Sequence, residues 1–119
     1  MKIKQVSEAC GLSIDTIRYY ERIGLVKVDK DEYFKKYSED TVDTLIAIKK
    51  LRFAGLTLAE VKRLVNIDKE ICELSPKEFA TVSDTINRAI LTTETKIKEL
   101  TESKRLLDNM KTKLQSIKE

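Results

Sequence analysis

The 119-residue sequence contains no histidine and no tryptophan, and it has only three glycines, two cysteines and one proline. Without histidine it lacks the commonest general base of enzymes, and it has no glycine-rich loop that could hold a phosphate. No credible pair of nucleophile and base remains, so enzymatic catalysis is the function class that the sequence favours least. The few glycines and prolines also allow few turns, and we therefore expect a mainly α-helical chain.

The two cysteines, Cys10 and Cys72, are far apart and have no metal-type spacing. A disulfide framework or a zinc site is therefore not expected, and we predict neither a metal site nor a cofactor. We expect Cys10, which lies within the first predicted helix, to be a packing residue. Cys72 is flanked by Glu70 and Glu73, whose charges favour the protonated thiol, so an inert thiol is the default and thiol sensing stays an open alternative.

The sequence has no apolar run near the roughly 18 residues that a membrane span requires. Its N-terminal residues also lack the basic, apolar and small-residue pattern of a signal peptide. We therefore expect a cytoplasmic protein with no membrane partner.

The net charge of +3 is located entirely in the first part of the sequence. Residues 1–67 carry 13 Lys and Arg against 10 Asp and Glu, whereas residues 68–119 carry 10 of each. This excess is a weak indication of contacts with nucleic-acid phosphates.

Four hydroxyl residues mark helix starts, because each stands between a hydrophobic residue just before it and another four residues after it. They are Ser13, Ser38, Thr57 and Ser75, and the last two are followed after three residues by glutamates that would complete capping boxes. With Gly11, Gly24 and Gly55 as stop signals, the pattern predicts helices near 5–10, 14–23, 39–54 and 58–66 and a long helix from 76. Between the second and third helices, Val26 and Val28 alternate with Lys27 before a polar DKDE turn, which predicts a small β-hairpin.

The long helix predicted from residue 76 has an apolar stripe along one face, with steps of mostly three and four residues. At 1.5 Å per residue it would extend roughly 60 Å, too far to be covered by a domain this small. A second copy of the chain is the simplest partner, so we expect a homodimer, with packing on the chain's own domain as the alternative. The predicted dimerisation residues are Ile86, Ile90, Ile97, Leu100, Leu107, Met110 and Leu114.

The first two predicted helices, joined by the turn GLS, have the spacing of a helix-turn-helix whose second helix enters the DNA major groove. The side chains expected to face inward are Val6, Ala9, Ile14, Ile17 and Tyr20. Those left to contact DNA, together with the capping residue Ser13, are Asp15, Thr16, Arg18 and Tyr19. Arginine can bind a guanine edge or a phosphate, and a tyrosine hydroxyl can reach phosphate.

Three stretches carry a resemblance to a known family: MKIKQVSEACGLSIDTIRYYERIGLV, then EYFKKYSEDTVDTLIAIKKLRFAGLTLAEVKRLV, then a long terminal helix. Over residues 1 to about 65 the sequence resembles the MerR family of bacterial transcriptional regulators. The resemblance implies a winged helix-turn-helix domain followed by a long antiparallel coiled-coil dimerisation helix. It also implies a homodimer that binds a palindromic operator in double-stranded promoter DNA, distorts an over-long promoter spacer, and so acts with RNA polymerase.

The resemblance also assigns individual residues. Arg18 and Tyr19 match the family's DNA contacts on the recognition helix, and Arg52 matches a basic residue that touches the DNA backbone. In the wing, Phe34 and Lys35 fall where the family usually has Tyr-Arg, and the neighbouring Lys36 and Tyr37 are also predicted to contact DNA. The wing departs from the family pattern, because it is short, acidic at its tip, and has Tyr33 where a glycine is usual.

The sensing devices of the family are missing, so the effector is unknown. Metal-sensing members carry two cysteines after the dimer helix, drug-sensing members add a ligand domain, and aldehyde-sensing members have a cysteine where this sequence has Lys50. We predict a DNA-binding domain over residues 1–67, a linker over 68–75 and the dimerisation helix over 76–119. The alternatives are an architectural, excisionase-like DNA-bending protein and a coiled-coil adaptor.

Overall fold

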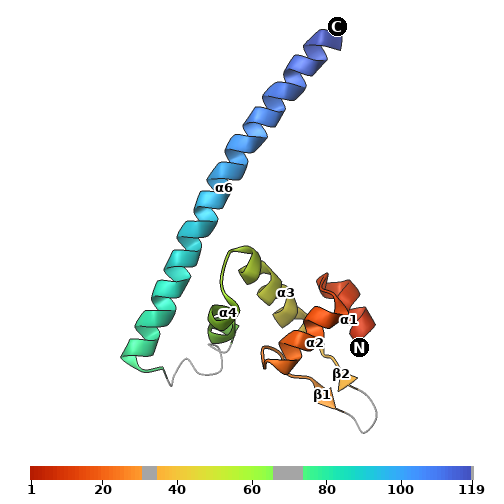
Figure 1. The fold of residues 1–119 in the computed structure, drawn as a ribbon, viewed down its shortest axis with the longest axis vertical. Helices are drawn as coiled ribbons and strands as arrows, with labels where there is room; N and C mark the ends of the chain where they lie inside the picture. The colour runs from red at the N-terminus through yellow and green to blue at the C-terminus, as the bar shows by residue number, and fades with distance from the viewer. Residues whose placement is uncertain (31–34, 66–73, 119) are drawn as a thin grey trace.

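A computed structural model describes residues 1–30, 35–65 and 74–118 of the chain, and it is mainly α-helical (Figure 1). Its elements are α1 (Ile3–Cys10), α2 (Ile14–Arg22), β1 (Asp29–Lys30), β2 (Lys35–Lys36), α3 (Glu39–Phe53), α4 (Leu58–Val65) and α6 (Pro76–Lys118). The five predicted helices are confirmed, and each observed bound lies within two residues of the predicted one. The largest difference is the start of α1, which begins earlier because the Lys2 N–H donates to Gln5 Oε1 at 3.0 Å. Residue 66, the predicted end of the fourth helix, lies outside the described residues.

Hydroxyl side chains begin the helices as the sequence predicts. The Ser13 Oγ accepts a hydrogen bond from the Thr16 N–H at 3.1 Å, and the Ser38 Oγ accepts one from the Thr41 N–H at 3.2 Å. Each bond satisfies one of the free amides of a first helical turn. These local bonds explain why the starts of α2 and α3 could be read from the sequence.

The capping box before α4 is complete. The Thr57 N–H donates to Glu60 Oε1 at 3.0 Å, and the Glu60 N–H donates to Thr57 Oγ1 at 3.2 Å. Before α6, the Glu78 N–H donates to Ser75 Oγ at 3.1 Å, which is the forward half of the box predicted there.

A short antiparallel ladder between β1 and β2 confirms a hairpin here, but its first strand is misplaced in the prediction. Strand β1 is formed by Asp29 and Lys30, which were expected in the turn, whereas Val26 and Val28 precede the strand. Asp29 is opposite Lys36, and Lys30 is opposite Lys35. Directly after β2, the Tyr37 N–H donates to the Met1 carbonyl at 3.1 Å. The hairpin is therefore fastened to the segment that precedes α1.

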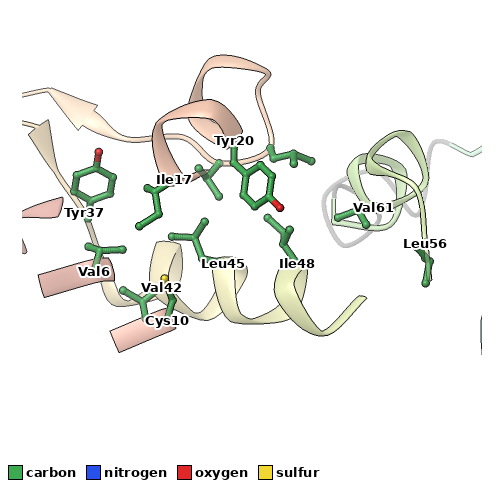
Figure 2. Packing of buried hydrophobic residues seen from close by; sticks show 12 residues of the cluster. Val6, Cys10, Ile17, Tyr20, Tyr37, Val42, Leu45, Ile48, Leu56 and Val61 are labelled. Carbon is green, nitrogen blue, oxygen red and sulfur yellow. The ribbon is translucent and has the colours of Figure 1, made fainter. Parts of the chain in front are cut away.

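The core lies where α1, α2, α3 and α4 meet (Figure 2). Its largest side chains without exposed surface are Val6, Ile17, Leu45, Ile48 and Val61. Because these come from all four short helices, the helices form one body with a common core.

One residue of the predicted inward set is wrong. Val6, Ile17 and Tyr20 are buried and Ile14 is half-buried, but Ala9 is exposed and Cys10 is buried in its place. Ala9 and Cys10 lie three and four residues after Val6, so the helical period allows either one on the face of Val6, and the packing of α1 on α3 buries Cys10. The expectation that Cys10 packs inside the domain is confirmed, with 4% of its surface exposed.

Helix α6 passes alongside α4 and then extends far beyond the other elements (Figure 1). Val82 and Thr85 near its start are buried, whereas every described residue of α6 after Lys96 is exposed. The Arg88 guanidinium forms an ion pair with the Glu60 carboxylate, and the Lys96 ammonium donates to the Phe53 carbonyl at 2.9 Å. Within the part of the chain that the structure describes, the contacts of α6 with the other helices thus lie in its first half. No described helix combines the length and apolar character needed to cross a membrane.

Candidate nucleic-acid interface

The turn between α1 and α2 has a defined geometry. Gly11 has φ 73°, a left-handed conformation that a side chain disfavours, and its N–H donates to the Ser7 carbonyl at 2.9 Å. The Ser7 Oγ donates to the Leu12 carbonyl at 2.5 Å, and the Lys49 ammonium lies 3.4 Å from the Gly11 carbonyl. These contacts fix the direction in which α2 leaves α1.

The first turn of α2 carries three of the predicted contact residues. Ser13 and Asp15 are exposed and Thr16 is half-buried. The hydroxyls of Ser13 and Thr16 are 2.7 Å apart and share a hydrogen bond. The Ser13 oxygen is therefore already used as the helix cap, and the Asp15 carboxylate is the most freely presented group of this turn.

Of the two adjacent tyrosines of α2, one is buried and the other is exposed, as the sequence predicts. Tyr20 is 8% exposed and belongs to the core, whereas Tyr19 is 39% exposed. Their ring centroids are 6.1 Å apart, with planes tilted by 47°. Tyr19 thus presents part of its ring and its hydroxyl on the surface of α2.

Arg22 belongs to this surface, and the sequence reasoning missed it. Its guanidinium carbon lies 5.3 Å from the centroid of the Tyr19 ring, within the range of a cation–π contact. The three-residue spacing from Tyr19 places the two side chains on one helix face and could have identified the pair.

Arg18 is also exposed on α2, and it lies near a polar pair formed by Glu21 and Tyr37. The Tyr37 hydroxyl donates to Glu21 Oε2 at 3.2 Å. Burial, the Glu21 charge and this hydrogen bond raise the pKa of Tyr37 above its ordinary value of 10.0, while the positive charge of Arg18 acts in the opposite direction. The positive charge of Arg18 therefore acts on the Tyr37 hydroxyl, which belongs to the residue directly after β2.

Tyr37 itself is corrected from a DNA contact to a core residue. Only 3% of its surface is exposed, and its hydroxyl is bonded within the chain. The physical reason is its place directly before the Ser38 cap, where a hydrophobic residue packs against the helix that follows; Val42, four residues after the cap, is also buried.

The remaining wing residues are only partly described. Lys35 and Lys36 form β2, and their backbones pair with Lys30 and Asp29. Phe34 lies outside the described residues. The DNA-binding roles of these three residues stay predictions.

Arg52 is exposed on the last turn of α3, and one guanidinium nitrogen, Nη1, donates to the Leu56 carbonyl at 2.7 Å. This bond closes the connection between α3 and α4. A guanidinium has five N–H groups in a planar fork, so Arg52 retains donors for a phosphate. Its predicted contact with the DNA backbone stays a prediction.

All seven predicted dimerisation residues are exposed in the single chain. Their exposed fractions lie between 39% at Ile86 and 69% at Leu114. The values within this range belong to Ile90, Ile97, Leu100, Leu107 and Met110. Ile86 and Ile90 also line a shallow apolar groove of about 280 Å³ with Leu51 and Leu64 of the neighbouring helices. A row of exposed apolar side chains on one helix is the surface that a partner helix would cover.

Within the three described ranges, no group of three Cys, Asp or Glu side chains gathers as metal ligands would. Cys10 is a free thiol in the core. Cys72 and the link around it lie outside these ranges, so the structure leaves the sensing alternative at Cys72 untested.

Comparison with known proteins gives consistent results. A family model described as MerR HTH family regulatory protein matches residues 1–66. Two curated relatives are the mercuric resistance operon regulatory protein of Bacillus cereus, 37% identical over 56% of this chain and 52% of its own length, and the HTH-type transcriptional regulator YfmP of Bacillus subtilis strain 168, 33% identical over 95% and 91%. A solved structure of a MerR family transcriptional regulator from Listeria monocytogenes is similar with a TM-score of 0.67 and 25% identity, covering 91% of this chain and 80% of that one.

Proposed function

Since the chain belongs to the MerR family of DNA-binding transcriptional regulators, which are not enzymes, we propose that it acts as a homodimer on a palindromic promoter operator. The observation that carries this proposal is the exposed face of α2, where Asp15, Arg18 and Tyr19 point away from the core. The division into a DNA-binding domain over residues 1–67, a linker over 68–75 and a dimerisation helix over 76–119 belongs to the same proposal.

The α2 face has the chemistry for DNA. The N-terminal half of a recognition helix lies in the major groove, and its arginines can bind guanine edges or phosphates. The bond between Tyr37 and Glu21 holds the hairpin against α2, which supports a role for Lys35 and Lys36 as a wing beside the recognition helix. Arg52, in the last turn of α3, would add a phosphate contact.

The exposed row on α6 supports the dimer. Burying one Leu or Ile side chain contributes roughly 1.5 to 3 kcal/mol, so seven such positions per chain can offset the cost of association. Two copies related by a two-fold axis would pair these rows in opposite directions. The same axis would direct two copies of α2 at two half-sites of one duplex.

Distortion of the promoter is the proposed mode of regulation. Bending a site by tens of degrees costs of order 1 to 6 kcal/mol, which the contacts of two DNA-binding halves would repay. An over-long spacer that is untwisted and bent would present its two elements to RNA polymerase in the correct alignment. The protein would then act where promoter DNA is, in the cytoplasm, and its effector is unknown.

The test is binding to duplexes that cover the promoter of the chain's own gene and those of its neighbours. Fluorescence anisotropy should identify one duplex with an inverted repeat that is bound as a dimer with steep salt dependence, and a scrambled duplex should bind weakly. Energy transfer between dyes at the duplex ends should report the bend. A dimer that binds no duplex at low ionic strength would favour the adaptor alternative, and equal bending of all duplexes would favour the architectural one.

A further inference from the structure

Tyr19 has two planar neighbours on α2, the ring of Tyr20 and the guanidinium of Arg22. The Tyr20 ring, which is in the core, supports the Tyr19 ring at 6.1 Å between centroids, and the Arg22 guanidinium lies over Tyr19 at 5.3 Å. The Tyr19 ring thus contacts a buried ring, with the two planes tilted by 47°, and a planar cation. This arrangement restricts a side chain that would otherwise sample several rotamers at the surface.

We propose that Arg22 is a positioning residue that fixes the Tyr19 ring in the orientation in which it contacts DNA, an inference that rests on the proposed function. A side chain ordered before binding loses less conformational entropy when the complex forms. The Tyr19 hydroxyl is the group that would reach the phosphate. Arg22 therefore contributes to affinity through Tyr19.

The place of Arg22 in α2 supports this role over a direct contact. It occupies the last turn of the helix, whereas the N-terminal half of a recognition helix is the part that lies in the groove. Its guanidinium is already placed on an aromatic face, an interaction that suits its flat, delocalised charge better than the compact ammonium of lysine. Arg18, four residues earlier, lies instead near Glu21 and Tyr37.

A simpler role for Arg22 is a favourable charge at the C-terminal end of α2. Lysine would fill that role equally well, because it keeps the positive charge. The substitution Arg22→Lys therefore separates the two roles. Arg63→Lys, in the last turn of α4, is the matched control, because Arg63 is exposed and contacts no aromatic ring among the described residues.

The first measurement uses the free full-length protein. In NMR spectra, Arg22→Lys should move the Tyr19 ring resonances toward those of a mobile tyrosine and leave the melting temperature and the Tyr20 resonances unchanged. The control Arg63→Lys should leave the resonances of both the Tyr19 ring and the Tyr20 ring unchanged. If the Tyr19 resonances do not respond to Arg22→Lys, the proposal is overturned, whatever the protein binds.

The second measurement is a double-mutant cycle for operator binding. Arg22→Lys should weaken binding about two- to fivefold, as expected for an exposed cation–π contact, without changing the salt slope. In the Tyr19→Ala background the same substitution should have no effect within error. An equal loss in both backgrounds would make Arg22 an independent phosphate contact and overturn the proposal. A clearly smaller salt slope for the single variant Arg22→Gln, which removes the charge, would do the same. If the wild-type protein binds no duplex, the proposed function fails, a result separate from the NMR outcome.

Discussion

The hydroxyl of Tyr37 donates a hydrogen bond to the carboxylate of Glu21 across 3.2 Å, and so joins the hairpin to the helix proposed to read DNA. Tyr37 also exchanges backbone hydrogen bonds with Met1, at 2.9 and 3.1 Å. One residue therefore connects the segment before α1, the hairpin and α2. The relative placement of α2 and the hairpin, on which a two-part DNA contact would depend, is fixed by a side chain that is itself buried.

Replacing Tyr37 by phenylalanine should weaken this connection. The variant loses one hydrogen bond to a charged group, and we expect the free energy of unfolding to fall by about 1.5 to 3 kcal/mol at pH 7. Urea unfolding followed by circular dichroism measures the change. Tyr19→Phe is the matched control, because the Tyr19 hydroxyl forms no hydrogen bond with the described residues, and it should alter stability by much less.

The same tyrosine predicts a loss of stability at high pH. Burial and Glu21 raise the pKa of Tyr37 in the folded protein above 10.0, so the folded state holds this proton more tightly than the unfolded state does. The stabilisation is complete below the unfolded pKa and is lost as pH rises through the folded pKa. Unfolding measured from pH 8 to 11 should show a steeper decline for the wild type than for Tyr37→Phe. Parallel curves for the two proteins would contradict the assignment.

Arg18→Ala should reduce affinity for the operator with little effect on the fold. Arg18 is exposed on α2. If its guanidinium forks onto a base edge, the loss should be roughly 1 to 3 kcal/mol and should differ between operator variants at one base pair. Anisotropy titrations of single-base operator variants provide the measurement. A uniform small loss across all variants would show a phosphate contact instead, and Arg63→Ala should leave affinity nearly unchanged.

Replacing both Leu100 and Leu107 by lysine should produce monomers. Both side chains are more than 60% exposed in the single chain and belong to the predicted apolar row. The two lysine charges would have to be buried against the partner helix, and burying an unpaired charge costs free energy. Sedimentation velocity measures the outcome. The matched control, Thr95→Lys with Glu102→Lys, has the same seven-residue spacing on the opposite face of α6 and should remain dimeric.

Gly11→Ala should destabilise the turn before α2. The backbone at Gly11 has φ 73°, and an added Cβ would lie 2.6 Å from the Lys49 ammonium nitrogen. The left-handed conformation alone should cost about 1 kcal/mol or more, measured by urea unfolding. Combining Gly11→Ala with Lys49→Ala should recover only the part due to the close contact. Full recovery would mean that backbone strain contributes little.

Much of the fold could be predicted from the sequence because its signals are local. Ser13, Ser38 and Thr57 bond to amides within three residues, so their helices could be bounded without knowledge of the tertiary structure. Tyr20 and Tyr19 could be assigned to opposite faces from the helical period alone. These predictions required no information about distant contacts.

The errors concern contacts that the sequence does not encode locally. Tyr37 was expected at the DNA, but it is buried beside the Ser38 cap, and its hydroxyl is bonded to Glu21, sixteen residues away in the chain. Ala9 and Cys10 are adjacent, and only the packing of α1 on α3 decides which of them is buried. For Arg22, the three-residue spacing places it on the same helix face as Tyr19, but the spacing alone does not give the orientation of the ring that the guanidinium contacts.

Helix α6 has 43 residues, yet its contacts with the other elements come only from its first half. An isolated helix with an uncovered apolar stripe is marginal in water, so the far half can be well ordered only when two chains meet. Its melting should therefore depend on protein concentration, whereas that of the four-helix body should not. If so, the number of copies in the cell sets what fraction of the chains is fully ordered.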